Sequence, residues 1–564
     1  MRRGIAIWAL ALLLLGAPAA LAEDEPSGGG GDGGSPATPT PLLHGELALS
    51  LKDAIAMGVE NNLDVEVQRH DPYIAGQRAE GSWGAYDPEL FGDWSYGSVE
   101  NPNTNPLLDQ QPGSAVVNLD IVTTRTSEGN GGLRGLVPKI GASYELGYTG
   151  SRNTFSTDFF ALSPEYRTDL SLSGTLPLMK DFLWSEPWFQ VKSTEILSEE
   201  SYHGFRRVLM DTVFSIPLTA TAPGVGIEAA YWDLVAAAEQ LRVAEKSVET
   251  AQALLEQTEA QYEVGVVSRV EVVESEAGVA QREFDRITAE NRYRRAQDQL
   301  IDLVLGRNLQ PTSRLEIRPT DSPEPIAYQV EADQAAALAF ELRPELVIAR
   351  KEVERLEIQT KFARNQMLPQ LDVVGSYGYS GLAGRPNGLS FSPGGTSVPR
   401  VQGDIPTRYS SADDDFFSAS KAVQWNAGAV FTFPLGNRGA RANARIADLE
   451  LRKAKTRLVR TEQDVILEVR DAIRNLRSAQ DGIAAAEARR RATEEQLRAE
   501  RIRLENGEST PFEVLDREED LVEAESQKIA ALQVYRNSLA ELDRAQGTIL
   551  RNRNVVVDQA LTLR

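Results

Sequence analysis

The chain has 564 residues, of which 82 are acidic and 59 are basic, and its formal charge is −23 at pH 7. Such an acidic chain is a poor candidate for nucleic-acid binding, because phosphates call for a basic face. The sequence contains no cysteine, which excludes disulfide bonds and a lipid anchor on an N-terminal cysteine.

The first 22 residues predict a secretory signal peptide. Two arginines form its charged start, an apolar stretch follows, and an A-x-A cleavage site ends at Ala22. The apolar stretch is shorter than the ~20 residues that span a bilayer, which disfavours a membrane anchor. We therefore expect the mature protein to begin at Glu23 with a Gly- and Pro-rich flexible linker, residues 23–44.

The rest of the chain repeats one pattern twice, in residues 45–330 (copy one) and 331–564 (copy two). A repeat of this length decides how the whole fold is interpreted. The number of residues that separates matching positions in the two copies decreases along the chain. Copy one therefore has 24 extra residues near the strands and 15 more in the helix that follows. The matching positions are Pro88 and Pro369 at an offset of 281, Pro177 and Pro434 at 257, and Gly265 and Gly507 at 242.

Each copy contains a pair of predicted strands. In copy two, residues 371–379 and 425–433 alternate apolar and polar side chains, and copy one has a similar pair at residues 90–97 and 168–176. A strand with one lipid face and one wet face requires this alternation, but half of a soluble β-sandwich would show it too.

Two further strand candidates, residues 116–123 and 140–149, lie between the strands of copy one. A chain that leaves one side of a membrane and returns crosses it an even number of times. These candidates therefore form a hairpin together or do not cross at all. We expect a hairpin that decorates the outer loop, which leaves four strands per chain.

Long helices are the stronger signal. Apolar residues recur at steps of four and three from Ala230, and again from Ala472, which predicts coiled-coil helices. In copy two, residues 434–507 would form a rod of about 100 Å at 1.5 Å per residue. In copy one, the prolines of residues 217–226 are expected to interrupt the corresponding rod.

Shorter helices complete each copy. Residues 270–305 follow the glycine turn of copy one, and residues 49–68 and 332–363 precede the two strand pairs. Two such helices stacked end to end would match one rod, with the Pro-rich residues 311–325 as the connection midway.

Each long helix is expected to turn back tightly at a tip. Gly265 and Gly507 suit the left-handed conformation that ends the incoming helix. A capping box, serine or threonine followed three residues later by glutamate, then begins each outgoing helix, with Ser268 and Glu271 in copy one and Thr510 and Glu513 in copy two.

This order of elements resembles the TolC-like outer membrane efflux protein family, from about Leu47 to Leu550. The resemblance implies an α+β membrane protein with a tandem-repeat α/β-barrel. Three chains with four strands each would form a 12-stranded outer membrane β-barrel, which continues into a long periplasmic coiled-coil α-helical cylinder. The motifs that carry it are Asn61-Asn62, Tyr86-Asp87-Pro88, Ala230-Tyr231-Trp232-Asp233-Leu234, Arg343-Pro344-Glu345-Leu346, Phe433-Pro434-Leu435-Gly436 and the two glycine tips.

The function that the resemblance implies is passive export of small molecules or proteins through an outer membrane channel of a Gram-negative bacterium. Such a channel serves a tripartite efflux pump or a type I secretion system and needs no cofactor. The expected partners are two further copies in a homotrimer, a periplasmic adaptor, an inner-membrane transporter and outer membrane lipid.

The resemblance also assigns roles to residues at the tips. Glu513, Asp516 and Glu271 would form a pore constriction, although the capping boxes alone explain Glu271 and Glu513. Leu504 and Ser509 stand where the family has its Tyr and Arg latch partners. The residues that would contact the adaptor are Gly265, Val266, Val267 and Ser268 in copy one, and Gly507, Glu508, Ser509 and Thr510 in copy two.

Two other classes of function compete with a channel. An enzyme is disfavoured, because the chain has three scattered histidines, no cysteine and no nucleophile-elbow, zinc-protease or phosphate-loop motif. A secreted or periplasmic coiled-coil scaffold would explain the heptads. It would not explain strands placed between the heptads in both copies.

Overall fold

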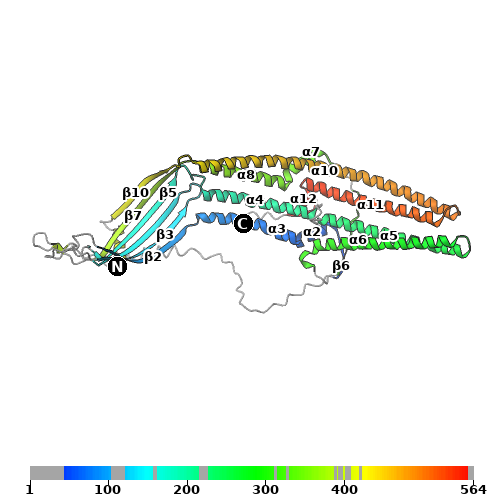
Figure 1. Cartoon of the computed structure of the whole chain (residues 1–564), viewed down its shortest axis with the longest axis horizontal. Coiled ribbons are helices and arrows are strands. Elements are labelled where there is room, and N and C mark those ends of the chain that lie inside the picture. Colours follow the sequence, from blue (N-terminus) through cyan, green and yellow to red (C-terminus); the bar gives the residue numbers. More distant parts are fainter. Residues whose placement is uncertain are drawn as a thin grey trace, which may run out of the picture. The chain divides into compact units, whose positions relative to one another are not determined.

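The computed structural model describes residues 44–102, 121–156, 160, 162–214, 226–309, 314–325, 330–386, 390–391, 398–399, 408–417 and 422–556 (Figure 1). These divide into two compact units. The sheet unit contains Glu80–Lys192 and Ile358–Asp448, and the helical unit contains Gly34–Ala79, Ser193–Glu357 and Leu449–Arg564. The expected signal peptide and most of the linker lie outside the described residues.

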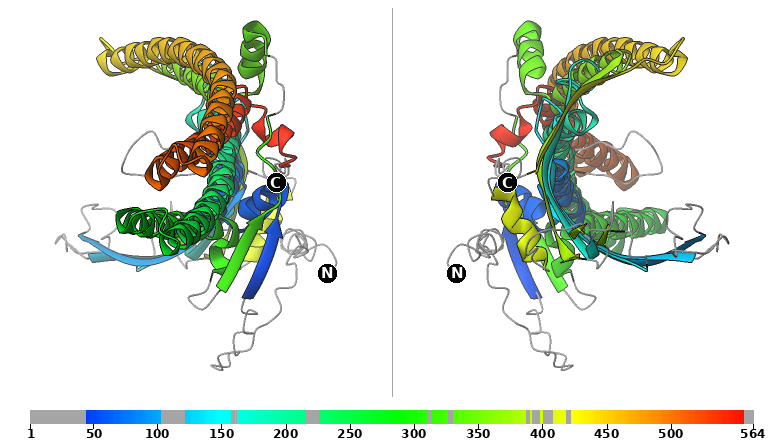
Figure 2. Two further views of the ribbon diagram at one scale, coloured as in Figure 1. Left: turned by 90° about the vertical axis from the view of Figure 1, so that its right-hand side faces the viewer. Right: turned by 90° about the vertical axis from the view of Figure 1, so that its left-hand side faces the viewer.

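The sheet unit is built on one antiparallel sheet of six strands in the order β10-β7-β5-β4-β3-β2. The sheet is curved rather than flat (Figure 2). Its strands are β2 (Glu89–Pro102), β3 (Ile121–Leu136), β4 (Ser143–Phe155), β5 (Leu162–Pro177), β7 (Gln370–Pro386) and β10 (Ala422–Thr432). The same unit contains η1 (Trp83–Tyr86), β8 (Ser390–Phe391), β9 (Val398–Pro399), α9 (Tyr409–Asp413) and η3 (Asp414–Phe417).

The expected strand count of four per chain is wrong. The extra segment of copy one does form a hairpin, but its strands β3 and β4 lie inside the sheet between β2 and β5 instead of decorating a loop. Strand β3 shows little hydrophobic alternation because it is rich in glycine, and aromatic neighbours cover those glycines. A Cβ at Gly135 would lie 2.6 Å from the Tyr144 hydroxyl, and one at Gly129 would lie 3.7 Å from Trp94 Cδ1.

The helical unit contains the long helices. Four of them, α3, α4, α8 and α10, lie only partly in this unit, and their other residues belong to the sheet unit. Its two short strands, β1 and β6, pair in parallel. The elements are β1 (His44–Leu49), α2 (Leu51–Asn61), α3 (Leu63–Ser82), α4 (Glu186–Val213), α5 (Ile227–Glu263), α6 (Arg269–Leu305), η2 (Gly306–Asn308), β6 (Arg314–Pro319), α7 (Ala332–Leu342), α8 (Pro344–Asn365), α10 (Arg438–Glu505), α11 (Pro511–Ala545) and α12 (Ile549–Asn552).

The long helices follow the predicted heptads. Helix α10 is continuous over 68 residues, whereas copy one has two helices, α4 and α5, in its place. Most of the interruption, residues 215–225, lies outside the described part of the chain. The predicted seam of α5 is largely buried, at Ala230, Leu234, Ala237, Ala244, Val248 and Ala251.

The helix before each strand pair is broken where the sequence predicted one continuous helix. The breaks fall at Asn62 and Arg343, which correspond between the copies and have nearly the same extended backbone, with ψ of 124° and 122°. Pro344 explains the second break, because proline lacks an N–H and disfavours a helical conformation at the preceding residue. At the first break, the Asn62 side chain accepts from the N–H groups of Asp64 and Val65 at 2.9 and 3.1 Å.

Three apolar clusters hold the helical unit together. The largest surrounds the fully buried Tyr231 of α5, and the second surrounds Tyr535 of α11. The third, between the two long hairpins, contains Ala251, Leu254, Leu497, Val514 and Leu515. None of the helices in the described ranges is long and apolar enough to cross a membrane.

Candidate functional site: the tips of the helical hairpins

The tip of copy one joins α5 to α6. Gly265 has φ of +80°, the left-handed region that glycine adopts without strain. The N–H of Val266 donates to the Gln261 carbonyl at 2.9 Å, the bond that closes a Schellman-type helix end. Helix α6 then begins with the predicted capping box, in which the Ser268 N–H donates to the Glu271 carboxylate at 3.5 Å.

The tip of copy two repeats this geometry between α10 and α11. Gly507 has φ of +73°, and the Glu508 N–H donates to the Arg503 carbonyl at 2.8 Å. Helix α11 begins with Pro511, and the Thr510 hydroxyl accepts from the Glu513 N–H at 3.4 Å. Corresponding glycines therefore build the same turn in the two copies, as predicted, while the capping box is reciprocal in copy one and is represented in copy two by the Thr510 bond.

The two turns contain all eight residues predicted to contact an adaptor. Large apolar side chains are unusually exposed there, with Val264 at 75%, Val266 at 72% and Phe512 at 56%. The Ser509 hydroxyl donates to Glu500 and, together with Arg503, lowers the pKa of that carboxyl. The tips thus offer exposed apolar groups on rigid, well-capped turns, a surface suited to docking. Contact with an adaptor remains a prediction.

The three predicted constriction acids have different surroundings. Glu513 and Asp516 lie one turn apart on the exposed face of α11, and Val514 and Leu515 on its other face are buried. Asp516 pairs with the adjacent Arg517 at 3.0 Å. Glu271, by contrast, is half-buried and engaged in the capping box. The geometry therefore favours a structural role for Glu271 and leaves the other two available to a pore.

Sequence reasoning missed a close contact between the two hairpins. A Cβ at Gly278 of α6 would lie 2.7 Å from Leu515 Cδ1 of α11. One turn further along, the buried Arg282 donates to the Leu515 carbonyl and the Glu519 carboxylate, both at 3.3 Å. We call these four residues the α6–α11 contact. A lone glycine inside a long helix was the available signal for such a close approach.

Helix α10 also contacts α11 near the tip. Arg501 pairs with Glu518 at 2.6 Å, and the Glu518 side chain is only 5% exposed. Leu504, at the position of the family's latch residue, is partly buried against the third apolar cluster. Apolar packing therefore occupies the position where the resemblance implied a polar latch.

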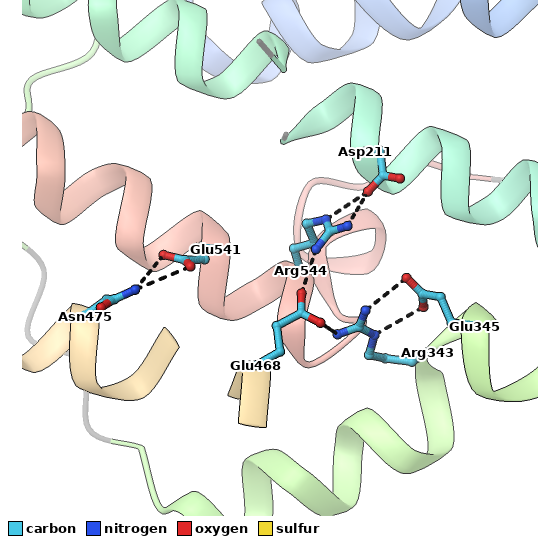
Figure 3. A network of polar contacts seen from close by, with 7 residues as sticks. All are labelled: Asp211, Arg343, Glu345, Glu468, Asn475, Glu541 and Arg544. Atoms are coloured by element: carbon cyan, nitrogen blue, oxygen red, sulfur yellow. Dashed lines mark hydrogen bonds and ion pairs between the residues drawn. The ribbon is translucent and has the colours of Figure 1, made fainter. Parts of the chain in front are cut away.

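A second group of polar residues lies at the break between α7 and α8. Arg343, whose side chain is 5% exposed, donates to Glu345 at 2.9 Å and to Glu468 at 2.5 Å. Arg544 donates to the other Glu468 oxygen at 2.7 Å and to Asp211 at 2.6 Å. Glu468 thus bridges two arginines, and this ionic network joins residues of α4, α8, α10 and α11 (Figure 3).

The described residues contain no cluster of three or more Asp, Glu or His side chains that could hold a metal ion. The tips combine two exposed turns, a pair of exposed carboxylates and the buried α6–α11 contact. This arrangement can dock another protein, attract cations and hold two hairpins closed.

Comparison with known proteins identifies a family and a fold. Residues 224–306 and 336–548 match a family described as outer membrane efflux protein. No curated relative matches the chain. Among solved structures, the outer-membrane channel OprN is 16% identical with a TM-score of 0.58, over 88% of this chain and 90% of that one. The CmeC outer membrane channel of Campylobacter jejuni is 15% identical with a TM-score of 0.56, over 90% of each chain.

Proposed function

The chain belongs to the outer membrane efflux protein family and is an outer membrane channel rather than an enzyme, and we propose that its two hairpin tips form the gate. It is located in the outer membrane, with its helical part extending into the periplasm. Family members are the outer membrane components of tripartite efflux pumps. A scaffold without channel activity is not favoured, because the matched family is described as outer membrane efflux protein and the match includes α5 and α6 of copy one and the strands and long helices of copy two.

The channel is proposed to be a homotrimer surrounded by outer membrane lipid. Three copies would close their curved sheets into one barrel, which leaves no strand edge exposed. The hairpins of the three copies would surround the periplasmic passage as a coiled-coil cylinder. The expected wall of twelve strands assumed four strands per chain, whereas six strands of this chain share one sheet.

The observation that best supports a gate at the tips is the pair of exposed acidic residues in copy two. Glu513 and Asp516 lie on the exposed face of α11, immediately after the tip. In a trimer they would place six carboxylates around a narrow passage. Such a ring attracts cations and repels anions.

The test is ion selectivity in planar bilayers. The double variant Glu513→Ala and Asp516→Ala should lose the cation preference of the parent channel and move the reversal potential toward zero in a salt gradient. Removing two acids from the middle of α10, with Glu462→Ala and Asp464→Ala, controls for overall charge and should preserve the preference. An unchanged reversal potential in the tip variant would refute the constriction.

Closure at the tip is proposed to depend on the α6–α11 contact. Arg282 is buried and bonded to both the backbone and a side chain of α11. Separating the hairpins would break both hydrogen bonds and expose the apolar contact between Gly278 and Leu515 to water, which costs free energy. The closed arrangement is therefore the favoured one until a partner compensates for the loss.

That partner is proposed to be a periplasmic adaptor, coupled to an inner-membrane transporter. The exposed Val266 and the corresponding Glu508 lie at the two tips. The chain contains no cysteine, so Val266→Cys and Glu508→Cys each introduce a unique thiol. Both should crosslink to the adaptor in cells, whereas Val459→Cys on exposed α10 should not. Equal crosslinking at all three positions would argue against docking at the tips.

A further inference from the structure

Two neighbouring rows of residues that cross all six strands differ sharply in polarity, although Arg125 and Arg152 lie further along the face of the apolar row. Residues paired directly across antiparallel strands lie on the same face of a sheet. One row that crosses all six strands is apolar and consists of Trp425, Tyr377, Leu172, Leu146, Leu133 and Leu90. The row one residue along each strand, on the opposite face, is polar and consists of Asn426, Ser376, Ser173, Glu145, Arg134 and Glu89.

The polar row lies on the concave side of the sheet. All six of its residues line one hollow of about 920 Å³. The backbone of the sheet is itself curved (Figure 2). On the apolar row, Leu90 and Trp425 at the two edges are 75% and 73% exposed. A wall with a concave wet side and a convex apolar side matches a sheet that surrounds water and faces lipid.

The β3–β4 hairpin takes part in both rows. Leu133 and Leu146 continue the apolar row, while Arg134 and Glu145 continue the polar one. Arg134 also pairs with Glu89 of β2 at 2.8 Å, on the concave side. A charged pair on a lipid-facing surface would be costly, so this placement is the one that a membrane wall requires. In these two rows, the β3–β4 hairpin has the side-chain pattern expected of a strand pair within a barrel wall.

We propose that the β3–β4 hairpin widens the outer opening of the channel. This inference rests on the proposed trimer, in which β2 of one copy pairs with β10 of the next. Three six-stranded sheets then close with eighteen strands instead of twelve. Barrel diameter grows roughly linearly with strand number, so the opening is about half as wide again. The outer mouth admits polar solutes and polymers that a twelve-stranded wall excludes.

The first experiment counts strands in the whole protein by electron cryomicroscopy of trimers in lipid nanodiscs. Eighteen strands are expected. A trimer with twelve strands and the hairpin outside the wall would overturn the inference and leave the proposed channel intact. A protein without trimers would instead refute the proposed function.

The second experiment measures the size of polyethylene glycols that enter from the outer side and lower the conductance. Deletion of Ile121–Phe155 removes β3 and β4 and joins β2 to β5. The parent should admit polymers of about 1.5-fold larger radius than the deletion variant. Polymers added from the tip side are the control and should give the same cut-off in both proteins. Equal cut-offs from the outer side would contradict the proposal, and if the variant forms no trimers, the strand count decides.

Discussion

The two helix breaks occupy corresponding places in the repeat but are stabilised by different physical means. At Asn62 the side-chain amide oxygen caps the next helix without any charge. At Arg343 a guanidinium with 5% exposure is held between two carboxylates. The backbone conformation is nearly identical, so the difference lies in the surroundings and not in the break itself.

The surroundings differ in how much apolar surface they bury. The cluster around Tyr231 contains 24 buried apolar residues and includes α2 beside the first break, whereas the cluster around Tyr535 at the second contains 12. The cap at Asn62 is therefore supported mainly by packing, although this region also contains an ion pair between Glu228 and Arg553 at 2.8 Å. Copy two relies in addition on an ionic network that includes Asp211 of copy one. Duplicated geometry thus does not imply duplicated energetics.

The sharpest test of this contrast compares Arg343→Ala with Asn62→Ala. The arginine variant leaves Glu345 and Glu468 without their shared cation and should lower the free energy of unfolding by about 3 kcal/mol, as for a broken buried pair. The asparagine variant loses one neutral cap and should cost about 1 kcal/mol. Denaturant unfolding of the purified protein measures both. Equal losses would remove the distinction between the two breaks.

A second test compares a glycine from each copy. An added Cβ at Gly482 of α10 meets nothing within 4 Å, so Gly482→Ala should stabilise the helix by roughly 0.5–1 kcal/mol. At Gly278 the new methyl group would crowd Leu515, so Gly278→Ala should be about 1 kcal/mol less stable than Gly482→Ala. Bilayer recordings should also show the Gly278 variant open more often. A Gly278 variant as stable and as closed as the Gly482 variant would refute tight α6–α11 packing.

The smallest expected effect is a pH response of opposite sign in the two copies. Burial raises the pKa of Glu345, but the hydrogen bond and charge of Arg343 outweigh it and leave the value below the ordinary 4.5. Its stabilisation is therefore present above pH 4.5 and is lost as the pH falls below that value. Burial raises the pKa of Glu228, which Arg553 offsets only in part, so protonation of Glu228 favours the folded state as the pH falls toward 4.5.

Hydrogen exchange, corrected for the intrinsic pH dependence, distinguishes these responses. Between pH 6 and pH 4, amides around Arg343 should become less protected while those around Glu228 become more protected. Glu345→Gln should abolish the first change and leave the second. A uniform loss of protection in both copies would show that the ionic network has no special part in acid sensitivity.

Sequence reasoning succeeded where neighbouring residues decide the structure. Each tip depends on a glycine at positive φ and on a helix cap formed by residues three positions apart. Gly265 and Gly507 therefore predicted both turns. The span between Pro434 and Gly507 predicted the length of α10, and the heptads predicted the buried seam of α5. Strand β3 was misjudged because its glycines carry no pattern of their own and depend on the aromatic side chains of neighbouring strands.

The sequence by itself thus determined the duplicated order of elements, the two tips and the candidate acids Glu513 and Asp516. Tertiary structure alone decided that six strands share one sheet, that Arg282 joins the hairpins and that Glu468 bridges two arginines. The reason is distance along the chain. Arg282 and Glu519 are 237 residues apart and Arg544 and Asp211 are 333 apart, so folding brings together partners that no local pattern can specify.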